Sequence, residues 1–281
     1  MTAGQERSWV LITGCSSGIG RALVAACRAG GWGVVATARS AGALEDLAPG
    51  PDLVRLELDV TRPASIAAAA EACRELRLTA LVNNAGYGQM GPLEWLGTDE
   101  LRAQFETNVL GLHAVTRAFL PLIRACAGPG AGRIVQVASV LGRMSVPMAG
   151  AYCASKHAVV ALAETLRLEE PGIPVILVEP GAIRSEFRGT LVKALGTLPE
   201  RLRGTRFGPV LARYLAQHEA RQRHGLGAEA CARRIAAAMT MAHPPRRLVI
   251  GADARWASAA KALLPGALWE WAVRRAFHLE P

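Results

Sequence analysis

Short apolar runs alternate with longer amphipathic stretches over the first two thirds of the chain. Six apolar runs, most of them without the two-residue alternation of a half-exposed strand, predict strands at residues 9–13, 33–37, 53–58, 80–83, 133–138 and 174–179. Helical patterns lie between them, at residues 19–28, 64–75, 98–123 and 152–170. Continuous apolar strands alternating with helices are typical of a parallel sheet covered by helices on both faces. We therefore predict a doubly wound α/β fold.

The last third of the chain follows a different pattern. Residues 184–226 interrupt the alternation with a Gly- and Arg-rich segment and one helix around residues 210–223, which we interpret as a substrate-loop and helix insertion. A late apolar run at residues 247–250 predicts a seventh strand at an edge of the sheet, and residues 252–281 predict a C-terminal helical extension. Because no repeat or linker divides the chain, we predict one domain over residues 1–281.

Composition narrows the class of protein. The chain has 281 residues, of which 51% are hydrophobic and 20% charged, so disorder is excluded and a large core can form. It has no run of about eighteen apolar residues and starts with polar residues, so we expect a soluble, cytoplasmic protein without a membrane span or leader. The six cysteines are irregularly spaced and the six histidines form no metal-ligand motif. We expect free thiols and no metal site.

The net charge of +9 is concentrated in the last third of the chain. Residues 184–281 contain 17 Lys or Arg and 7 Asp or Glu, whereas residues 1–183 contain 15 and 16. A basic region can bind nucleic acid or an anionic membrane. The arginines are scattered along helical patterns without interleaved aromatic residues, which disfavours nucleic acid as a partner.

A glycine-rich turn follows the first predicted strand, in the run Thr13-Gly-Cys-Ser-Ser-Gly-Ile-Gly20. Glycines allow a tight turn and close approach of the backbone to a pyrophosphate, whose charge is favourable at the N-terminus of the following helix. Between an apolar strand and a helix, such a turn indicates a dinucleotide site. A plain turn is the alternative for a glycine-rich run that stands alone.

Tyr152 and Lys156 are the main candidates for catalysis. They are four residues apart on a predicted helix, which places both side chains on one face. A tyrosine with a pKa near 10 is a poor base at neutral pH. We expect the ammonium of Lys156 and a cationic nicotinamide to lower the pKa of Tyr152 by about 1–3 units. Tyr152 would then exchange a proton with a substrate oxygen while hydride passes to or from the cofactor.

These motifs and four others in the same order resemble the short-chain dehydrogenase/reductase family over about residues 8–190. The others are Asn83-Asn-Ala-Gly86, Asn108 in the next helix, Ser139 at the end of the fifth strand and Pro180-Gly181 after the sixth. The glycine-rich run, the residues Ala36-Thr-Ala-Arg39 and the long C-terminal region are most similar to the hydroxysteroid and retinol dehydrogenase branch. The resemblance implies a Rossmann fold with a seven-stranded parallel sheet, and we expect a homodimer or homotetramer.

The resemblance also implies a role for each motif residue. Tyr152 would be the general acid or base, and Ser139 would bind the substrate oxygen. Lys156 would hold the nicotinamide ribose, and Asn108 would hold a water that links Lys156 to solvent. Ser185, where the family often has threonine, would bind the nicotinamide amide. The expected cofactor-binding residues are Gly14, Ser16, Ser17, Gly18, Ile19, Gly20, Ala38, Arg39, Asp59, Val60, Asn84, Ala85, Gly86, Asn108, Tyr152, Lys156, Pro180, Gly181, Ile183 and Ser185.

The end of the second strand favours NADP(H) as the cofactor. NAD-binding members place an acid there, which binds the ribose 2′-hydroxyl and would repel a 2′-phosphate. Here the matching position is Ala38, followed by Arg39, and no carboxylate lies between Ala38 and Glu45. An arginine fork suits a phosphate monoester, and Ser17 would donate a further bond. Asp59 would meet the adenine amino group.

We therefore predict an NADP(H)-dependent alcohol dehydrogenase or carbonyl reductase. The candidate pocket segments, residues 141–148 and 183–192, favour a steroid-, retinoid- or long-chain-like substrate, although their side chains could instead be core. Their apolar members are Met144, Val146, Met148, Phe187 and Leu191. One alternative is a sugar-nucleotide epimerase or dehydratase of the extended type, which the turn spacing and the missing substrate domain disfavour. Another is a non-catalytic NADP-binding sensor or regulator, which the presence of both Tyr152 and Lys156 disfavours.

The C-terminal end predicts an amphipathic helix after Pro265 and Gly266. One apolar stripe runs along it, formed by Trp269, Ala272, Val273, Ala276 and Phe277. The plainer interpretation is a helix packed on its own domain or on a second subunit. The alternative is a helix that covers the substrate pocket or makes weak, salt-sensitive peripheral contact with an anionic membrane, which nearby tryptophans and arginines favour.

Overall fold

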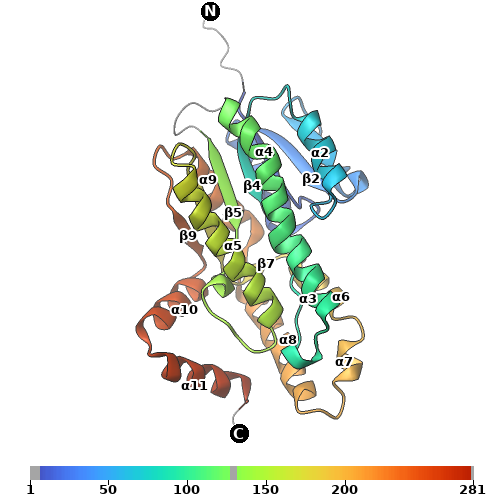
Figure 1. The fold of residues 1–281 in the computed structure, drawn as a ribbon, viewed down its shortest axis with the longest axis vertical. Helices are drawn as coiled ribbons and strands as arrows, with labels where there is room; N and C mark the ends of the chain where they lie inside the picture. Colours follow the sequence, from blue (N-terminus) through green and yellow to red (C-terminus); the bar gives the residue numbers. More distant parts are fainter. Residues whose placement is uncertain (1–6, 127–131, 280–281) are drawn as a thin grey trace, which may run out of the picture.

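A seven-stranded parallel sheet forms the centre of the molecule (Figure 1). The computed structural model describes residues 7–126 and 132–279. The strand order is β3-β2-β1-β4-β5-β6-β9, and every neighbouring pair is parallel. The strands are β1 (Trp9–Ile12), β2 (Gly33–Ala38), β3 (Leu53–Glu57), β4 (Leu78–Asn83), β5 (Arg133–Val137), β6 (Val175–Pro180) and β9 (Arg247–Ile250). The predicted doubly wound sheet is confirmed, including its late edge strand.

Helices cover both faces of this sheet. Helices α1 (Gly18–Ala29) and α9 (Ala228–Thr240) pack on one face, and α2 (Pro63–Ala72), α4 (Leu112–Cys126) and α5 (Gly150–Glu169) pack on the other. The inner strands therefore bury side chains in both directions. In β1, Val10 and Ile12 face the α1 side, whereas Leu11 faces the α4 side, and all three are fully buried. This double coverage explains the continuous apolar runs in the sequence.

The helix before β5 is long and changes its winding near the middle. Helix α3 (Thr98–Phe105) continues through a π-helical segment, η3 (Glu106–Gly111), into α4. By length and composition alone, Thr98–Cys126 could cross a membrane. The side chains of Val115, Phe119 and Ile123 are instead fully buried against the sheet, as expected for the core helix of a folded domain. Short 3₁₀ segments within the described residues are η1 (Ala41–Leu44), η2 (Leu93–Trp95) and η4 (Val140–Gly142).

The remaining elements gather beyond the carboxyl ends of the strands, at the lower end of Figure 1. Helices α6 (Phe187–Leu195), α7 (Leu198–Arg201) and α8 (Phe207–His224) occupy the segment in which the sequence predicted one helix. A two-stranded parallel pair, β7 (Ile183–Arg184) and β8 (Leu226–Gly227), closes that segment at its base. Helices α10 (Ala252–Leu263) and α11 (Gly266–Phe277) follow β9.

A third apolar cluster packs several of these helices against the start of α5. It contains buried residues of α6, α8 and α11 together with residues of α5, including Tyr152. In α11, Phe277 is buried and its ring stacks on Tyr214 with centroids 6.1 Å apart, and Val273 packs on the same cluster. Two residues of the stripe predicted on α11 thus pack on this cluster, whereas Ala276 is exposed.

Candidate active site

The glycine-rich turn and the Asn83–Gly86 motif contact each other at the carboxyl ends of β1 and β4. The Thr13 Oγ1 accepts bonds from the backbone N–H groups of Asn84 and Ala85, both at 2.9 Å. The Asn84 side-chain amide donates to the carbonyl groups of Thr13, at 2.9 Å, and Gly14, at 3.1 Å. The sheet reverses its direction of winding between β1 and β4, which is where doubly wound folds bind dinucleotides.

Glycine is required at two positions of this turn. Gly14 has φ +73°, and a Cβ there would lie 2.9 Å from the Cα of Ala85. A Cβ on Gly20 would lie 2.2 Å from the carbonyl oxygen of Gly14. The bare backbone leads into the N-terminus of α1 at Gly18, beside the exposed Ser16. Backbone N–H groups at a helix start fit a pyrophosphate, so the turn suits the dinucleotide expected there.

The residues expected near the adenosine lie at the ends of β2 and β3. Ala38 is buried as the last residue of β2, and Arg39 after it is exposed. Asp59 accepts bonds from the backbone and hydroxyl of Thr61 at 2.9 and 2.7 Å. Burial opposes ionisation of this carboxyl, but the Thr61 bonds and the nearby charge of Arg39 lower its pKa. The positive charge of Arg39 therefore lies near the carboxylate of Asp59.

Asn108 lies in the π-helical segment and is fully buried. Its Nδ2 donates to the carbonyl of Tyr87, at 3.0 Å, and to the hydroxyl of Ser155, at 3.1 Å, while its Oδ1 accepts from the Tyr87 N–H at 3.1 Å. A Cβ on Gly86 would lie 3.0 Å from that Oδ1 and 3.7 Å from the Nζ of Lys156. Asn108, Gly86 and Lys156 thus meet at one point.

Ser139, Tyr152 and Lys156 lie together where β5 ends and α5 begins. Each side chain is less than a tenth exposed. The hydroxyl groups of Ser139 and Tyr152 share a hydrogen bond. The Nζ of Lys156 lies 5.8 Å from the centre of the Tyr152 ring and donates to the carbonyl of Val137 at 2.8 Å. The structure therefore brings together all four residues expected to be catalytic.

The protein's own groups shift the pKa of Tyr152 upward, whereas the predicted lowering also depends on the charge of a bound nicotinamide. Burial raises the pKa of Tyr152 to about 12, although its hydrogen bond with Ser139 acts in the other direction. Burial also lowers the pKa of Lys156 to about 8. Loss of hydration destabilises both the phenolate of Tyr152 and the ammonium of Lys156. The Lys156 ammonium donates to the carbonyl of Val137 and lies farther from the Tyr152 ring. At neutral pH Tyr152 is thus an acid, and Lys156 is charged beside it.

The segment expected to bind the nicotinamide returns to the glycine-rich turn. A Cβ on Gly18 would lie 3.2 Å from the Cβ of Ser185, so Ser185 is adjacent to the start of α1. Gly181 follows β6, and the N–H of Ala182 donates to the carboxylate of Asp253 at 2.7 Å. Residues from β6 and from the C-terminal region therefore both shape this loop. Pro180 and Ile183, also expected at the cofactor, are buried at its two ends.

A charge cluster around the buried Glu179 links this loop to the Ser139 segment. Glu179, fully buried in β6, accepts from the Nε and Nη2 of Arg143 at 2.7 and 2.5 Å. It also accepts from the Nη1 of Arg247 in β9 at 2.7 Å, and Arg247 contacts Glu164 of α5. Arg143 ends the short segment that begins at Ser139. The cluster ties that segment to the strand that leads into Pro180-Gly181.

Sequence reasoning missed two buried polar residues beside the site. One is Glu179, for which the signal was an acid inside an otherwise apolar predicted strand. The other is Gln104, whose amide donates to the carbonyl of Tyr87 at 2.9 Å and accepts from the N–H of Gln89 at 2.6 Å. Gln104 and Asn108 together hold the segment after Gly86. Nothing in the sequence distinguished Gln104 from other polar helix residues.

The candidate pocket residues lie next to Tyr152. The ring of Phe187 packs on that of Tyr152 with centroids 5.9 Å apart, and Met148 and Leu191 are buried in the same apolar cluster. Val146 packs against the cluster, and Met144 is buried. A cavity of about 290 Å³ adjoins the cluster, lined by Gly91, Pro92, Leu93, Glu94, Val146, Pro147, Met148, Gly150, Phe207 and Leu279. The surroundings of Tyr152 on this side are apolar.

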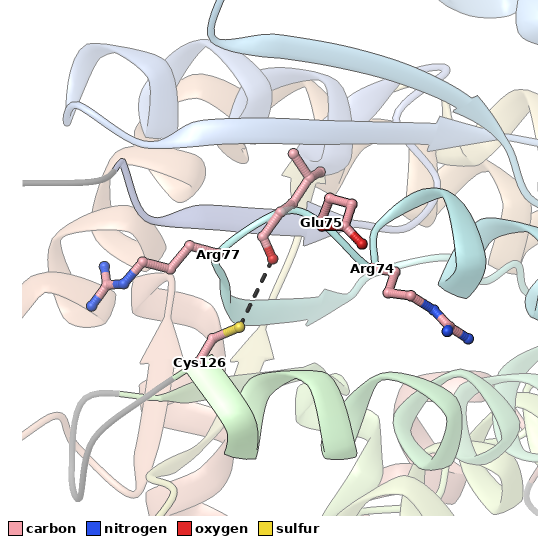
Figure 2. A pocket seen from close by; sticks show the side chains of 5 residues that line it. Arg74, Glu75, Arg77 and Cys126 are labelled. Carbon is pink, nitrogen blue, oxygen red and sulfur yellow. Dashed lines mark hydrogen bonds between the residues drawn. The ribbon is translucent and has the colours of Figure 1, made fainter.

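Another cavity lies at the opposite end of the sheet (Figure 2). It has a volume of about 310 Å³ and is lined by Arg74, Glu75, Leu76, Arg77 and Cys126. Cys126, at the end of α4, donates to the carbonyl of Leu76 at 3.8 Å. Residues 74–77 precede the amino end of β4, and Cys126 is the last residue of α4. Tyr152 lies instead at the start of α5. This cavity is separate from the candidate active site.

The structure also gives the state of the cysteines and the grouping of possible metal-ligating side chains. All six cysteines are free, and five of them are buried. Over residues 7–126 and 132–279, no group of three or more His, Cys, Asp or Glu side chains is arranged to hold a metal ion. Burial raises the pKa of several thiols, including those of Cys15 and Cys27, to about 12. These thiols are therefore unreactive hydrophobic groups in the core.

Residues 8–196 match the family described as short chain dehydrogenase. The chain belongs to the short-chain dehydrogenase family. It is 39% identical over 183 residues to the uncharacterized oxidoreductase YbbO of Escherichia coli K12, covering 63% of this chain and 66% of that protein. It is 39% identical over 207 residues to human 17-beta-hydroxysteroid dehydrogenase type 1, covering 69% and 61%. The matched region thus spans just under two thirds of the length of these relatives.

Solved short-chain dehydrogenases share the fold over nearly the whole chain. A short-chain dehydrogenase from Streptomyces avermitilis is 33% identical with a TM-score of 0.77, covering 97% of this chain and 98% of that one. One from Burkholderia cenocepacia, in complex with NADP, is 26% identical with a TM-score of 0.73, covering 98% and 99%. One from Burkholderia phymatum, in complex with NAD, is 28% identical with a TM-score of 0.75, covering 87% and 89%. Structures of the family thus hold either dinucleotide.

Proposed function

We propose that this short-chain dehydrogenase is an NADP(H)-dependent oxidoreductase that interconverts an alcohol and a ketone or aldehyde. One observation carries the proposal. Ser139, Tyr152 and Lys156 are buried together, with the two hydroxyl groups hydrogen-bonded, at the end of the sheet that carries the glycine-rich turn. A buried phenol beside a second hydroxyl and an ammonium can bind a carbonyl oxygen and give it a proton.

The protonation states of Tyr152 and Lys156 support carbonyl reduction. Ser139 Oγ and Tyr152 Oη would both donate hydrogen bonds to the carbonyl oxygen. As negative charge develops on that oxygen, the Tyr152 proton moves to it, and the ammonium of Lys156 stabilises the phenolate that remains. A bound nicotinamide would supply the hydride. Asn108 fixes the Gly86 segment next to Lys156, where a water would return the proton from solvent.

The end of β2 supports NADP(H) rather than NAD(H). Ala38 presents no carboxylate that would repel a 2′-phosphate, and the exposed Arg39 is free to reach outward from the strand end. Hydrogen bonds to a charged partner are worth about 1.5–3 kcal/mol. We therefore expect kcat/KM with NADPH to exceed that with NADH by at least about tenfold, since tenfold corresponds to about 1.4 kcal/mol.

The cofactor preference is tested with two variants. Ala38→Asp should narrow or reverse the preference, because its carboxylate would repel the 2′-phosphate and accept the 2′-hydroxyl of NADH. Arg39→Gln, at an exposed position, should weaken NADPH binding and leave NADH binding nearly unchanged. Steady-state kinetics with both cofactors give the ratios. Equal wild-type kcat/KM with NADPH and NADH would show that the interpretation of this strand end is wrong.

The apolar cluster around Tyr152 supports an apolar substrate. The ring of Phe187 packs on that of Tyr152, and Met148 and Leu191 belong to the same apolar cluster. The adjoining cavity is lined mainly by apolar side chains. A steroid, retinoid or long-chain alcohol or carbonyl matches these surroundings.

A substrate screen tests the proposed reaction. Purified protein and NADPH are mixed with apolar ketones and aldehydes, small polar carbonyls and nucleotide sugars, and NADPH consumption is followed by absorbance. We expect consumption with apolar carbonyls and the slowest rates with polar ones. NADPH binding without consumption by any carbonyl would instead support a sensor or regulator. Conversion of a nucleotide sugar without net loss of cofactor would support an epimerase.

A further inference from the structure

Large apolar side chains are exposed on the last two helices. Among residues that the structure describes, Trp256 is 78% exposed and Leu263 82% on α10, while Leu268 is 46% and Trp271 55% exposed on α11. All six tryptophans of the chain lie in the described ranges, and only these two belong to the exposed class. In Figure 1, α10 and α11 project from the lower left edge of the molecule, away from the sheet.

On α10 the exposed residues form a regular stripe. Ala252, Trp256, Ala259 and Leu263 are spaced by four, three and four residues, so they share one side of the helix, and all are exposed. The buried Ala254 lies on the opposite side. A helix at the surface of a globular domain normally turns polar residues to solvent. Helix α10 turns an apolar stripe to solvent instead.

On α11 the outward face differs from the stripe that packs inward. Phe277 and Val273 face the chain's own apolar cluster, whereas Leu268 and Trp271 face solvent with the arginines that follow them. The Arg275 guanidinium lies 5.9 Å from the centre of the Trp271 ring. Tryptophan and arginine side by side are typical of helices that lie at a membrane–water interface.

Charge distinguishes the partners that this surface fits. Residues 252–279 contain four basic residues (Arg255, Lys261, Arg274, Arg275) and two acidic ones. One of the acids, Asp253, is bonded to the backbone of Ala182. A second copy of the chain would bring these positive charges against each other. An anionic surface would attract them.

We propose that α10 and α11 dock this protein on anionic lipid bilayers through the surface formed by Trp256, Leu263, Leu268 and Trp271, with Arg255, Arg274 and Arg275 contacting the headgroups. Leu279, two residues after α11, lines the apolar cavity beside the Tyr152 cluster. Docking would therefore place that cavity near the lipid. The binding does not depend on the proposed reaction.

Co-sedimentation with vesicles tests the proposal on the full chain. We expect the protein to pellet with vesicles of equal parts phosphatidylcholine and phosphatidylglycerol at about 0.02 M salt and to be released at about 0.5 M. It should remain in the supernatant with pure phosphatidylcholine. Tryptophan fluorescence should shift to shorter wavelength only with the anionic vesicles, because Trp256 and Trp271 enter the interface.

Matched variants distinguish binding through this surface from nonspecific hydrophobic adsorption. Trp256→Gln/Trp271→Gln and Leu263→Gln should lower vesicle binding, the double variant by at least about tenfold. Leu168→Gln, at a leucine of α5 that is also 82% exposed, should not. Arg274→Gln/Arg275→Gln should weaken binding more than Arg233→Gln/Arg234→Gln on α9, which removes the same charge. Thermal unfolding checks that each variant is folded.

Three outcomes would overturn the proposal. The first is wild-type protein that stays in the supernatant with anionic vesicles at low salt. The second is binding that Trp256→Gln/Trp271→Gln leaves unchanged. The third is a wild-type dimer that this double variant converts to monomer while vesicles bind neither form, which would make the surface an interface between copies of the chain.

Discussion

At the scale of single residues, the chemistry depends on two pKa values that sequence alone does not determine. The spacing of Tyr152 and Lys156 places them on one helix face, and this was predictable. Their pKa values depend on burial by residues distant in the chain, such as Phe187 and Val137, which the spacing does not contain. The spacing therefore predicted that the two side chains lie together, but it did not contain the burial that raises the pKa of Tyr152 in the protein without its cofactor.

The pH profile of carbonyl reduction should report Lys156. Its pKa of about 8 means that the ammonium is charged below that pH and neutral above it. Tyr152, with a pKa of about 12, stays protonated throughout this range. We expect kcat/KM for the carbonyl to fall as pH rises through about 8, because the neutral amine no longer stabilises the phenolate.

A charge that does not titrate provides the control for this profile. In Lys156→Arg the guanidinium keeps its charge to a pH above about 12, so the descending limb should move to higher pH even if the overall rate is lower. A wild-type profile that stays flat from about pH 7 to 10 would contradict the assignment. A Lys156→Arg profile whose descending limb lies at the same pH as in the wild type would also contradict this assignment.

At the scale of elements, the strands were predictable and their supports were not. Continuous apolar runs gave all seven strands to within a few residues, because the sheet is covered on both faces. The run that ends at Glu179 looked like any other strand. Its role appears only where β6, β9 and the segment after β5 meet, since Arg143 and Arg247 come from separate parts of the chain.

The Arg143–Glu179 fork should position Ser139 relative to the nicotinamide segment. Arg143→Lys keeps the charge but loses the two-point contact, so we expect kcat to fall by about tenfold with little change in NADPH affinity. The primary isotope effect with deuterated NADPH should rise, because a misplaced substrate slows hydride transfer itself.

Arg28 and Asp52 provide a matched fork away from the site. The Nε and Nη2 of Arg28 both lie 2.8 Å from the carboxylate of Asp52, between α1 and the start of β3. Arg28→Lys should lower thermal stability about as much as Arg143→Lys and leave kcat and the isotope effect unchanged. Similar kinetics in the two variants would show that the Glu179 cluster serves stability alone.

At the scale of the whole molecule, the sequence predicted the sheet and its seven strands but only part of the region beyond their carboxyl ends. One helix was predicted within residues 184–226, whereas the structure has three. Glycines at 189, 196, 204 and 208 weaken the helical pattern there. The apolar residues of these helices, such as Leu191 and Leu198, pack on the Tyr152 cluster rather than on the sheet. Nothing in the local sequence pattern predicts this third apolar cluster.

The central claim is that Tyr152 donates the proton in carbonyl reduction, and single-turnover kinetics with Tyr152→Phe test it most directly. Protein saturated with NADPH is mixed with a carbonyl identified by the substrate screen, and NADPH oxidation is followed by stopped-flow absorbance. NADPH affinity, measured by fluorescence, should be nearly unchanged, because phenylalanine preserves the packing on Phe187. We predict a turnover at least about 100-fold slower than wild type, within the range for loss of a general acid. A folded variant that turns over at the wild-type rate would contradict the account.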